Sequence, residues 1–157
     1  MSIDIVQDRQ ERWDRGMEQA GRLMQQHGRH IDSAAQKTMT ALNLFMIHSI
    51  GACGGHWGYG HPYPWIIIGL TERGQGSLIN TLPILSLLDD FYANHPCSSD
   101  CRLILISRNN SDAFDLRSQG AAFQWARSEE DRLQKLAEYQ QEMAAFTTFL
   151  KQRFFQS

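Results

Sequence analysis

The sequence predicts a single-domain α/β (α+β) protein, with a small mixed sheet of two central apolar strands, two N-terminal helices and a long C-terminal helix. Two continuously apolar runs, at 65–71 and 102–107, are typical of strands in a sheet that is covered on both faces. Helical periodicity precedes the first run and follows the second. The length of 157 residues, with 42% apolar and 20% charged residues, suits one domain with its own core, so residues 1–157 are taken as one domain.

The first predicted helix covers residues 4–28. Its apolar residues, among them Trp13, Met17 and Met24, recur at a helical spacing and so share one face. Acidic and basic residues alternate on the opposite face, as is typical of a helix surface in contact with water. Gly28 is expected to end this helix.

A second helix is predicted from an N-cap at Asp32 to Ile50, where Gly51 can close it in the left-handed conformation. The segment 51–64 is predicted to be a loop rich in glycine and aromatic residues. Its five glycines would cost too much backbone entropy in a helix or a strand. Two prolines at its end direct the chain into an extended path towards the strand at 65–71.

Gly74 and Gly76 indicate a tight turn after the first strand. The next helix is predicted to have its cap near Thr81 and Pro83 in its first turn, where the missing amide of proline does no harm. It is expected to end near Ala93, because an Asn-His-Pro sequence follows. A short connector then leads to the second apolar strand.

Two alternatives stay open for residues 113–127, since alternating large apolar residues suit a strand and two consecutive alanines suit a helix. The last helix is predicted to run from 129 to 154, with Ser128 in a capping box and three acidic residues in the first turn. The apolar side of this helix is expected to consist of Leu133, Leu136, Met143, Phe146 and Leu150.

Composition argues against several classes of protein. A formal net charge of −2 gives no electrostatic reason to expect binding to nucleic acid or to an anionic membrane. No apolar run reaches the roughly 20 residues of a membrane span, and the polar N-terminus carries no visible signal peptide. Three cysteines, an odd number, do not indicate a disulfide framework, so we expect a cytoplasmic protein with reduced thiols.

The glycine turn does not complete a phosphate-binding motif. A Walker motif would need lysine followed by serine or threonine, and a dinucleotide fingerprint would need a third glycine where Ile79 stands. Ser77 follows Gly76 but lacks the second glycine of a nucleophile elbow. No nucleophile, acid and base converge by spacing alone, so an enzyme is not the favoured interpretation.

Cysteine and histidine residues suggest one alternative site. Cys53 and His56 have a Cys-x2-His spacing, and Cys97 and Cys101 have a Cys-x3-Cys spacing. If the two apolar strands form a parallel pair, both segments lie at strand entries, and the four side chains provide a tetrahedral zinc site. The same residues can instead be small buried side chains, or one cysteine can pair with His56 or His95 as a thiol–imidazole site.

The chain has more aromatic residues than its end elements need for one small core. Four of them are predicted to bind a partner protein, because an aromatic helix edge beside a rigid loop is typical of an interface core. These residues are Trp57 and Tyr59 of the loop and Phe149 and Phe155 of the last helix. The alternative is that the rings pack on the N-terminal helix of the same chain.

Three short motifs occur in order between residues 65 and 136. They are Arg73-Gly74, His95-Pro96-Cys97-Ser98 leading to Arg102-Leu103-Ile104, and Phe123 followed by Arg132-Leu133. In this order the chain resembles the IcmW-type adaptors of Dot/Icm type IV secretion systems. The resemblance implies a small non-enzymatic chaperone-adaptor that pairs with a second small protein and presents effectors to a coupling complex. The chain departs from that family in being nearly neutral and in having the loop at 51–64.

The favoured interpretation is therefore a protein-interaction subunit, an adaptor or chaperone-like component of a larger assembly, with a homodimer or heterodimer left open. Its partner is another protein, with no membrane insertion and no cofactor. The alternative is a small zinc-binding or thiol-using protein with a Cys53, His56, Cys97 and Cys101 site.

Overall fold

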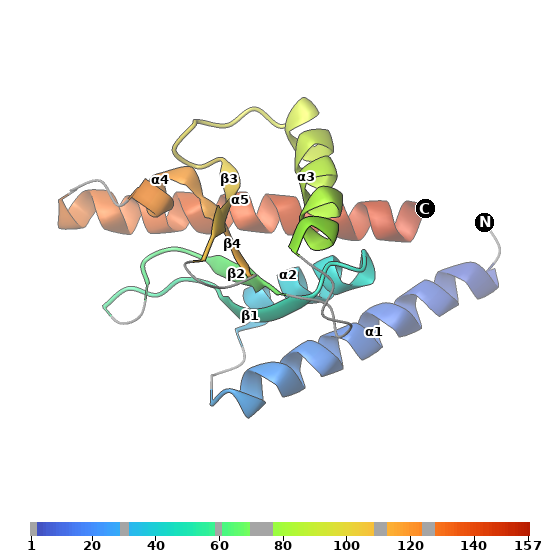
Figure 1. Ribbon diagram of the computed structural model, residues 1–157. Coiled ribbons are helices and arrows are strands. Elements are labelled where there is room, and N and C mark those ends of the chain that lie inside the picture. Colours follow the sequence, from blue (N-terminus) through green and yellow to red (C-terminus); the bar gives the residue numbers. More distant parts are fainter. Residues whose placement is uncertain (1–2, 29–31, 59–60, 70–76, 109–112, 124–127) are drawn as a thin grey trace.

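The computed structural model describes residues 3–28, 32–58, 61–69, 77–108, 113–123 and 128–157 (Figure 1). The described elements are α1 (Ile3–Gln26), α2 (Ser33–Leu44), β1 (Ser49–Cys53), β2 (Trp65–Ile68), α3 (Ser77–Ala93), β3 (Leu103–Ser107), β4 (Phe114–Ser118), α4 (Gln119–Phe123) and α5 (Glu129–Gln156). The mixed α/β class and the long C-terminal helix are confirmed. The predicted turn at Gly74 and Gly76 lies outside the described residues.

The four strands form one sheet in the order β1-β2-β4-β3, and every neighbouring pair is antiparallel. The expected parallel pairing of the two apolar strands is therefore wrong. The two strands are β2 and β3, and β4 lies between them, so β2 is central and β3 is at an edge. The physical reason is the short β3–β4 connection, which favours a hairpin, whereas a parallel pair needs a long crossover.

The second helix ends earlier than expected, at Leu44 rather than Ile50. Met46 has a φ of 63°, and this left-handed residue turns the chain back before Gly51 is reached. The side chain of Asn43 then accepts hydrogen bonds from the amide and the hydroxyl of Ser49, at 3.0 and 2.9 Å. Residues predicted as helix end and loop start form the edge strand β1 instead.

Pro83 lies inside α3, because this helix begins at Ser77 and not near Thr81. At that position proline leaves one helical carbonyl without its usual amide donor. The sequence-based prediction placed Pro83 in the first turn to avoid this loss. The predicted end of the helix, at Ala93, is confirmed. The open segment 113–127 contains both alternatives in turn, since β4 is followed directly by α4, and residues 124–127 lie outside the described part.

The core lies on one face of the sheet, where α2, α3 and α5 cover it (Figure 1). Ile66, Ile68 and Leu116 alternate towards that face, and all three are fully or almost fully buried. Phe146 of α5 is completely buried at its centre. The predicted apolar side of α5 is buried apart from Leu133, which is exposed. The Ser128 hydroxyl accepts from the Asp131 amide, as the capping box predicts.

Gly120 of α4 sits in a place that no larger residue fits. A Cβ atom there would meet Oδ1 of Asp100 and would lie 2.5 Å from the hydroxyl oxygen of Tyr139. The carboxylate of Asp100 is held in place by Lys135 Nζ at 2.7 Å, so it does not move aside cheaply. Close packing here joins α4 to the connector before β3.

We expect Gly120→Ala to lower the free energy of unfolding by about 1–3 kcal/mol, because the added methyl group overpacks a fixed contact. Gly51→Ala is the matched control, since its Cβ would lie 3.4 Å from the flexible end of Ile67. Urea unfolding of both variants measures the difference. Equal stability of the two variants would contradict the packing at Gly120.

Candidate functional site

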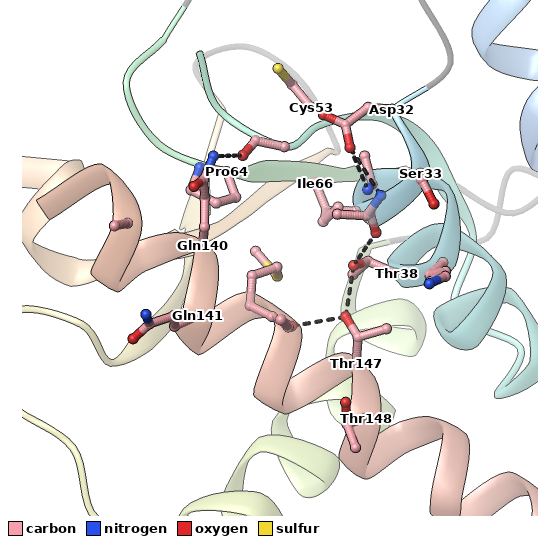
Figure 2. A pocket seen from close by; sticks show the side chains of 17 residues that line it. Asp32, Ser33, Thr38, Cys53, Pro64, Ile66, Gln140, Gln141, Thr147 and Thr148 are labelled. Atoms are coloured by element: carbon pink, nitrogen blue, oxygen red, sulfur yellow. Dashed lines mark hydrogen bonds between the residues drawn. The ribbon is translucent and has the colours of Figure 1, made fainter. Parts of the chain in front are cut away.

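A cavity of about 690 Å³ lies between the start of α2, the end of β1 and the middle of α5. Figure 2 shows the side chains that line it. Its polar lining includes Asp32, Thr38, Gln140, Gln141 and Thr147, and Ile66 and Met143 belong to its apolar lining.

The polar groups of this cavity are bound to the chain itself. Asp32 Oδ1 accepts from the amides of Ala34 and Ala35 at 3.0 and 3.1 Å, so its carboxylate caps α2. The hydroxyls of Thr38 and Thr147 lie 2.7 Å apart in a buried contact between α2 and α5. The geometry supports packing and capping rather than an acid–base pair aimed at a substrate.

The loop after β1 docks on α5 beside this cavity. Gln140 Nε2 donates to the carbonyl oxygens of Gly54 and Gly55 at 3.1 and 3.4 Å. Gly54 packs directly against the Asp32 carboxylate, and Gly55 has a φ of 86° with Leu136 Cδ1 2.9 Å from where its Cβ would be. These two glycines are therefore required by a close approach and by a left-handed backbone.

A second candidate site surrounds Glu142, a charged residue buried in α5. Its Oε1 lies 2.7 Å from Nε2 of His95, with the Glu142 and His95 side chains 5% and 33% exposed. The hydroxyl of Tyr92 lies 3.5 Å from the same carboxylate and accepts from the amide of Leu103 at 2.7 Å. The cluster thus joins α3, the connector after it, β3 and α5.

Cys97 belongs to the same cluster. Burial, and then the negative charge of Glu142, raise the pKa of the Cys97 thiol. Burial likewise raises the pKa of the Tyr92 phenol. A protonated thiol is a poor nucleophile, and the His95 imidazole faces Glu142 through Nε2. The arrangement fits a structural tether better than the thiol–imidazole site considered from the sequence.

Sequence reasoning missed Glu142 and Tyr92, although a signal for Glu142 was present. It falls between Tyr139 and Phe146 on the buried side of α5, where an acidic residue needs a partner. From the sequence, the partner, His95, was considered only in a thiol–imidazole site with a cysteine. The pairing depends on how the connector folds back on α5, which local sequence does not reveal.

The four predicted zinc ligands do not come together. Cys53 and His56 lie at and after the end of β1, whereas Cys97 and Cys101 precede β3 at the opposite edge of the sheet. Two strands separate these edges, a distance of ~14 Å at the usual strand spacing. Within the described residues, no three His, Cys, Asp or Glu side chains are grouped to hold a metal ion.

The predicted partner-binding residues lie in separate places. Trp57 is 37% exposed, in the loop that docks on the N-terminal half of α5, and Tyr59 is outside the described residues. Phe149 and Phe155 are half-buried near the other end of α5, with ring centroids 5.4 Å from Phe91 and 6.2 Å from Trp13 respectively. The binding of a partner by these four residues stays a prediction, with the loop and the two phenylalanines at different places along α5.

An exposed apolar group at the start of α1 was not recognised from the sequence. Ile3, Ile5 and Val6 are 83%, 45% and 49% exposed. The periodic pattern assigned the whole helix to one packed face, but Trp13 is its first buried residue, and before it only Arg9 and Arg12 contact α5. The signal was the helix length, which exceeds what the rest of the domain can cover.

No protein family, no curated protein sequence and no solved structure matches this chain. Among the described helices, none has both the length and the apolar character needed to cross a membrane.

We expect Glu142→Gln to lower the pKa of Cys97, because it removes the negative charge that opposes thiolate formation. Alkylation of Cys97 by iodoacetamide, followed by mass spectrometry across a pH series, should show its midpoint at lower pH than in the wild type. Asp90→Asn is the control, since Asp90 pairs with Arg153 and not with this cluster. An unchanged midpoint in Glu142→Gln would show that the carboxylate does not act on the thiol.

Proposed function

We propose that this chain is a non-enzymatic protein-interaction subunit, an adaptor or chaperone-like component, and that a partner protein covers the first turns of α1. The exposure of Ile3, Ile5 and Val6 is the observation that carries this proposal. Ile3 and Val6 lie three positions apart and so share one face of α1, and Ile5 is exposed on an adjoining face.

Energetics favours a covering partner. Residues 3–12 form a helical segment without buried side chains, and a helix of that length is marginal in water by itself. Complete burial of an exposed aliphatic side chain contributes about 1.5–3 kcal/mol, so Ile3 would add most of that range to association and the half-exposed Ile5 and Val6 less. A partner therefore gains from the apolar contact and also stabilises the segment.

The patch continues towards one of the residues predicted from the sequence. Val6, Arg9 and Trp13 are spaced three and four residues apart, so they share one face of α1. Arg9 Nη1 donates to the carbonyl oxygen of Phe155 at 2.8 Å, and the half-buried Phe155 ring packs against Trp13 at a tilt of 49°. The proposed surface thus runs from the start of α1 to the end of α5, which lie side by side in Figure 1.

The resemblance to IcmW-type adaptors supports a second small protein as the partner. A cytoplasmic, secretion-linked assembly as the setting rests on the same resemblance. The three cysteines are free thiols, which accords with a reducing compartment.

We expect Val6→Glu to abolish co-purification of the partner from the native host. The melting temperature should stay unchanged, because the Val6 side chain is half exposed and contributes little to the stability of the fold. Gln19→Glu is the matched control, since it adds the same charge at an exposed position of α1. Retention of the wild-type partner by Val6→Glu would refute the α1 surface.

The loop is proposed as a second contact. Trp57→Ala is expected to weaken partner binding by about tenfold, equivalent to ~1.4 kcal/mol, without unfolding the chain. It is a cleaner probe than Phe149→Ala, because Phe149 packs on Phe91 and its loss would also weaken the fold. Titration of the purified partner against both proteins gives the measurement, and equal affinities would exclude the loop.

A further inference from the structure

The hydrogen bonds between β3 and β4 determine which backbone groups of β3 face outwards. The amide of Gln119 donates to the carbonyl of Arg102 at 2.8 Å, and the amide of Arg108 donates to the carbonyl of Ala113 at 3.1 Å. Bonded and non-bonded positions alternate along an antiparallel ladder. The even-numbered residues of β3 therefore bond to β4, and Leu103, Leu105 and Ser107 direct their amides and carbonyls away from the sheet.

Tyr92 occupies one end of this outer edge. Its hydroxyl accepts from the Leu103 amide at 2.7 Å. Further along, the outward amides and carbonyls of Leu105 and Ser107 have no hydrogen-bond partner in the described part of the chain. Four backbone groups in a row are thus available to another strand.

The opposite edge of the sheet is bordered by helices. In β1 the amide of Ser49 donates to Asn43 Oδ1 at 3.0 Å, and Ala52 is almost fully buried where α1 and α2 pack along the strand. Open edge strands are normally protected by a charge, a proline or a bulge. The sequence of β3, Leu-Ile-Leu-Ile-Ser, has neither charge nor proline, and its register with β4 is unbroken.

Side chains next to this edge define what can bind. Ile104 and Ile106 are half-buried on the face of the sheet that points away from the core. Arg102 and Arg108 flank the strand, and the Arg108 side chain is 44% exposed although it pairs with Asp115 at 3.0 Å. The edge is therefore apolar in its middle and basic at its ends.

We propose that the outer edge of β3 binds an extended segment of another polypeptide as an added antiparallel strand, with the pattern acidic-x-aliphatic-x-aliphatic. The residue opposite Leu105 exchanges two backbone hydrogen bonds with it. The residues opposite Ile106 and Ile104 are the two aliphatic positions, because they share that face of the sheet. The acidic residue comes first, opposite Arg108, and Tyr92 ends the site at Leu103.

Charge favours this partner over a second copy of the chain. Antiparallel pairing of two β3 strands centred on Leu105 would place Arg102 opposite Arg108 of the other copy, twice. Like charges directly opposite one another are destabilising. This edge is distinct from the α1 surface, so the inference goes beyond the proposed function and stands without it.

The test uses the full chain and two synthetic peptides, Glu-Thr-Val-Thr-Val and Lys-Thr-Val-Thr-Val, each with blocked ends. We expect the acidic peptide to bind at least about tenfold more tightly, because its carboxylate meets Arg108. Ser107→Pro should weaken acidic-peptide binding by about tenfold, since proline removes an outward amide and no β4 bond. Ser107→Ala keeps the amide and should bind as the wild type does.

Amide hydrogen exchange gives a second measurement that does not depend on any variant folding. In the free protein the amides of Leu105 and Ser107 should exchange quickly, while those of Ile104 and Ile106 are protected by β4. The acidic peptide should protect Leu105 and Ser107. Protection of these two amides without peptide, equal binding of the two peptides, or a dimer that protects them as concentration rises would each overturn the proposal.

Discussion

The structure depends on one apolar stripe along α5, a helix of 28 residues against which α1, α2, α3 and β4 pack. Phe91 of α3 lies 5.3 Å from Phe146 between ring centroids, and Thr38 of α2 meets Thr147 at 2.7 Å. The loop after β1 is tied to the same helix through Gln140. Because each segment contacts a different turn of α5, that helix sets the spacing between them. Both candidate sites, the cavity and the Glu142 cluster, are formed where these segments meet α5.

Glu142 shows what this dependence demands. A carboxylate within the buried stripe is costly unless it is paired and hydrogen-bonded. His95 supplies the pairing and Tyr92 the additional contact, and both come from the end of α3 and the connector beyond it. The buried carboxylate of Glu142 therefore requires the end of α3 and the connector after it to pass beside α5. Raised pKa values at Cys97 and Tyr92 follow from the same burial and keep protons on groups that a reaction would need deprotonated.

Local rules in the sequence predicted the helices and the apolar strands well, because caps and periodicity act within a few residues. The cap at Asp32, the capping box at Ser128 and the end of α3 follow such rules. Strand order does not, since the placement of β4 between β2 and β3 is a long-range pairing. β1 was missed because an unusual left-handed Met46 ends α2 before Gly51. The predicted zinc site depended on a parallel pairing, and the antiparallel order instead places its two pairs of residues at opposite edges of the sheet.

The two edges of the sheet differ because the helices are distributed unevenly. α1 and α2 both contact β1, at one edge of the sheet (Figure 1). At the far edge, β3 is bordered by Tyr92 at one end. A protein that joins two others needs surfaces whose occupants do not compete. The two proposed surfaces would meet that requirement, because they use different elements, α1 and β3, around a single core.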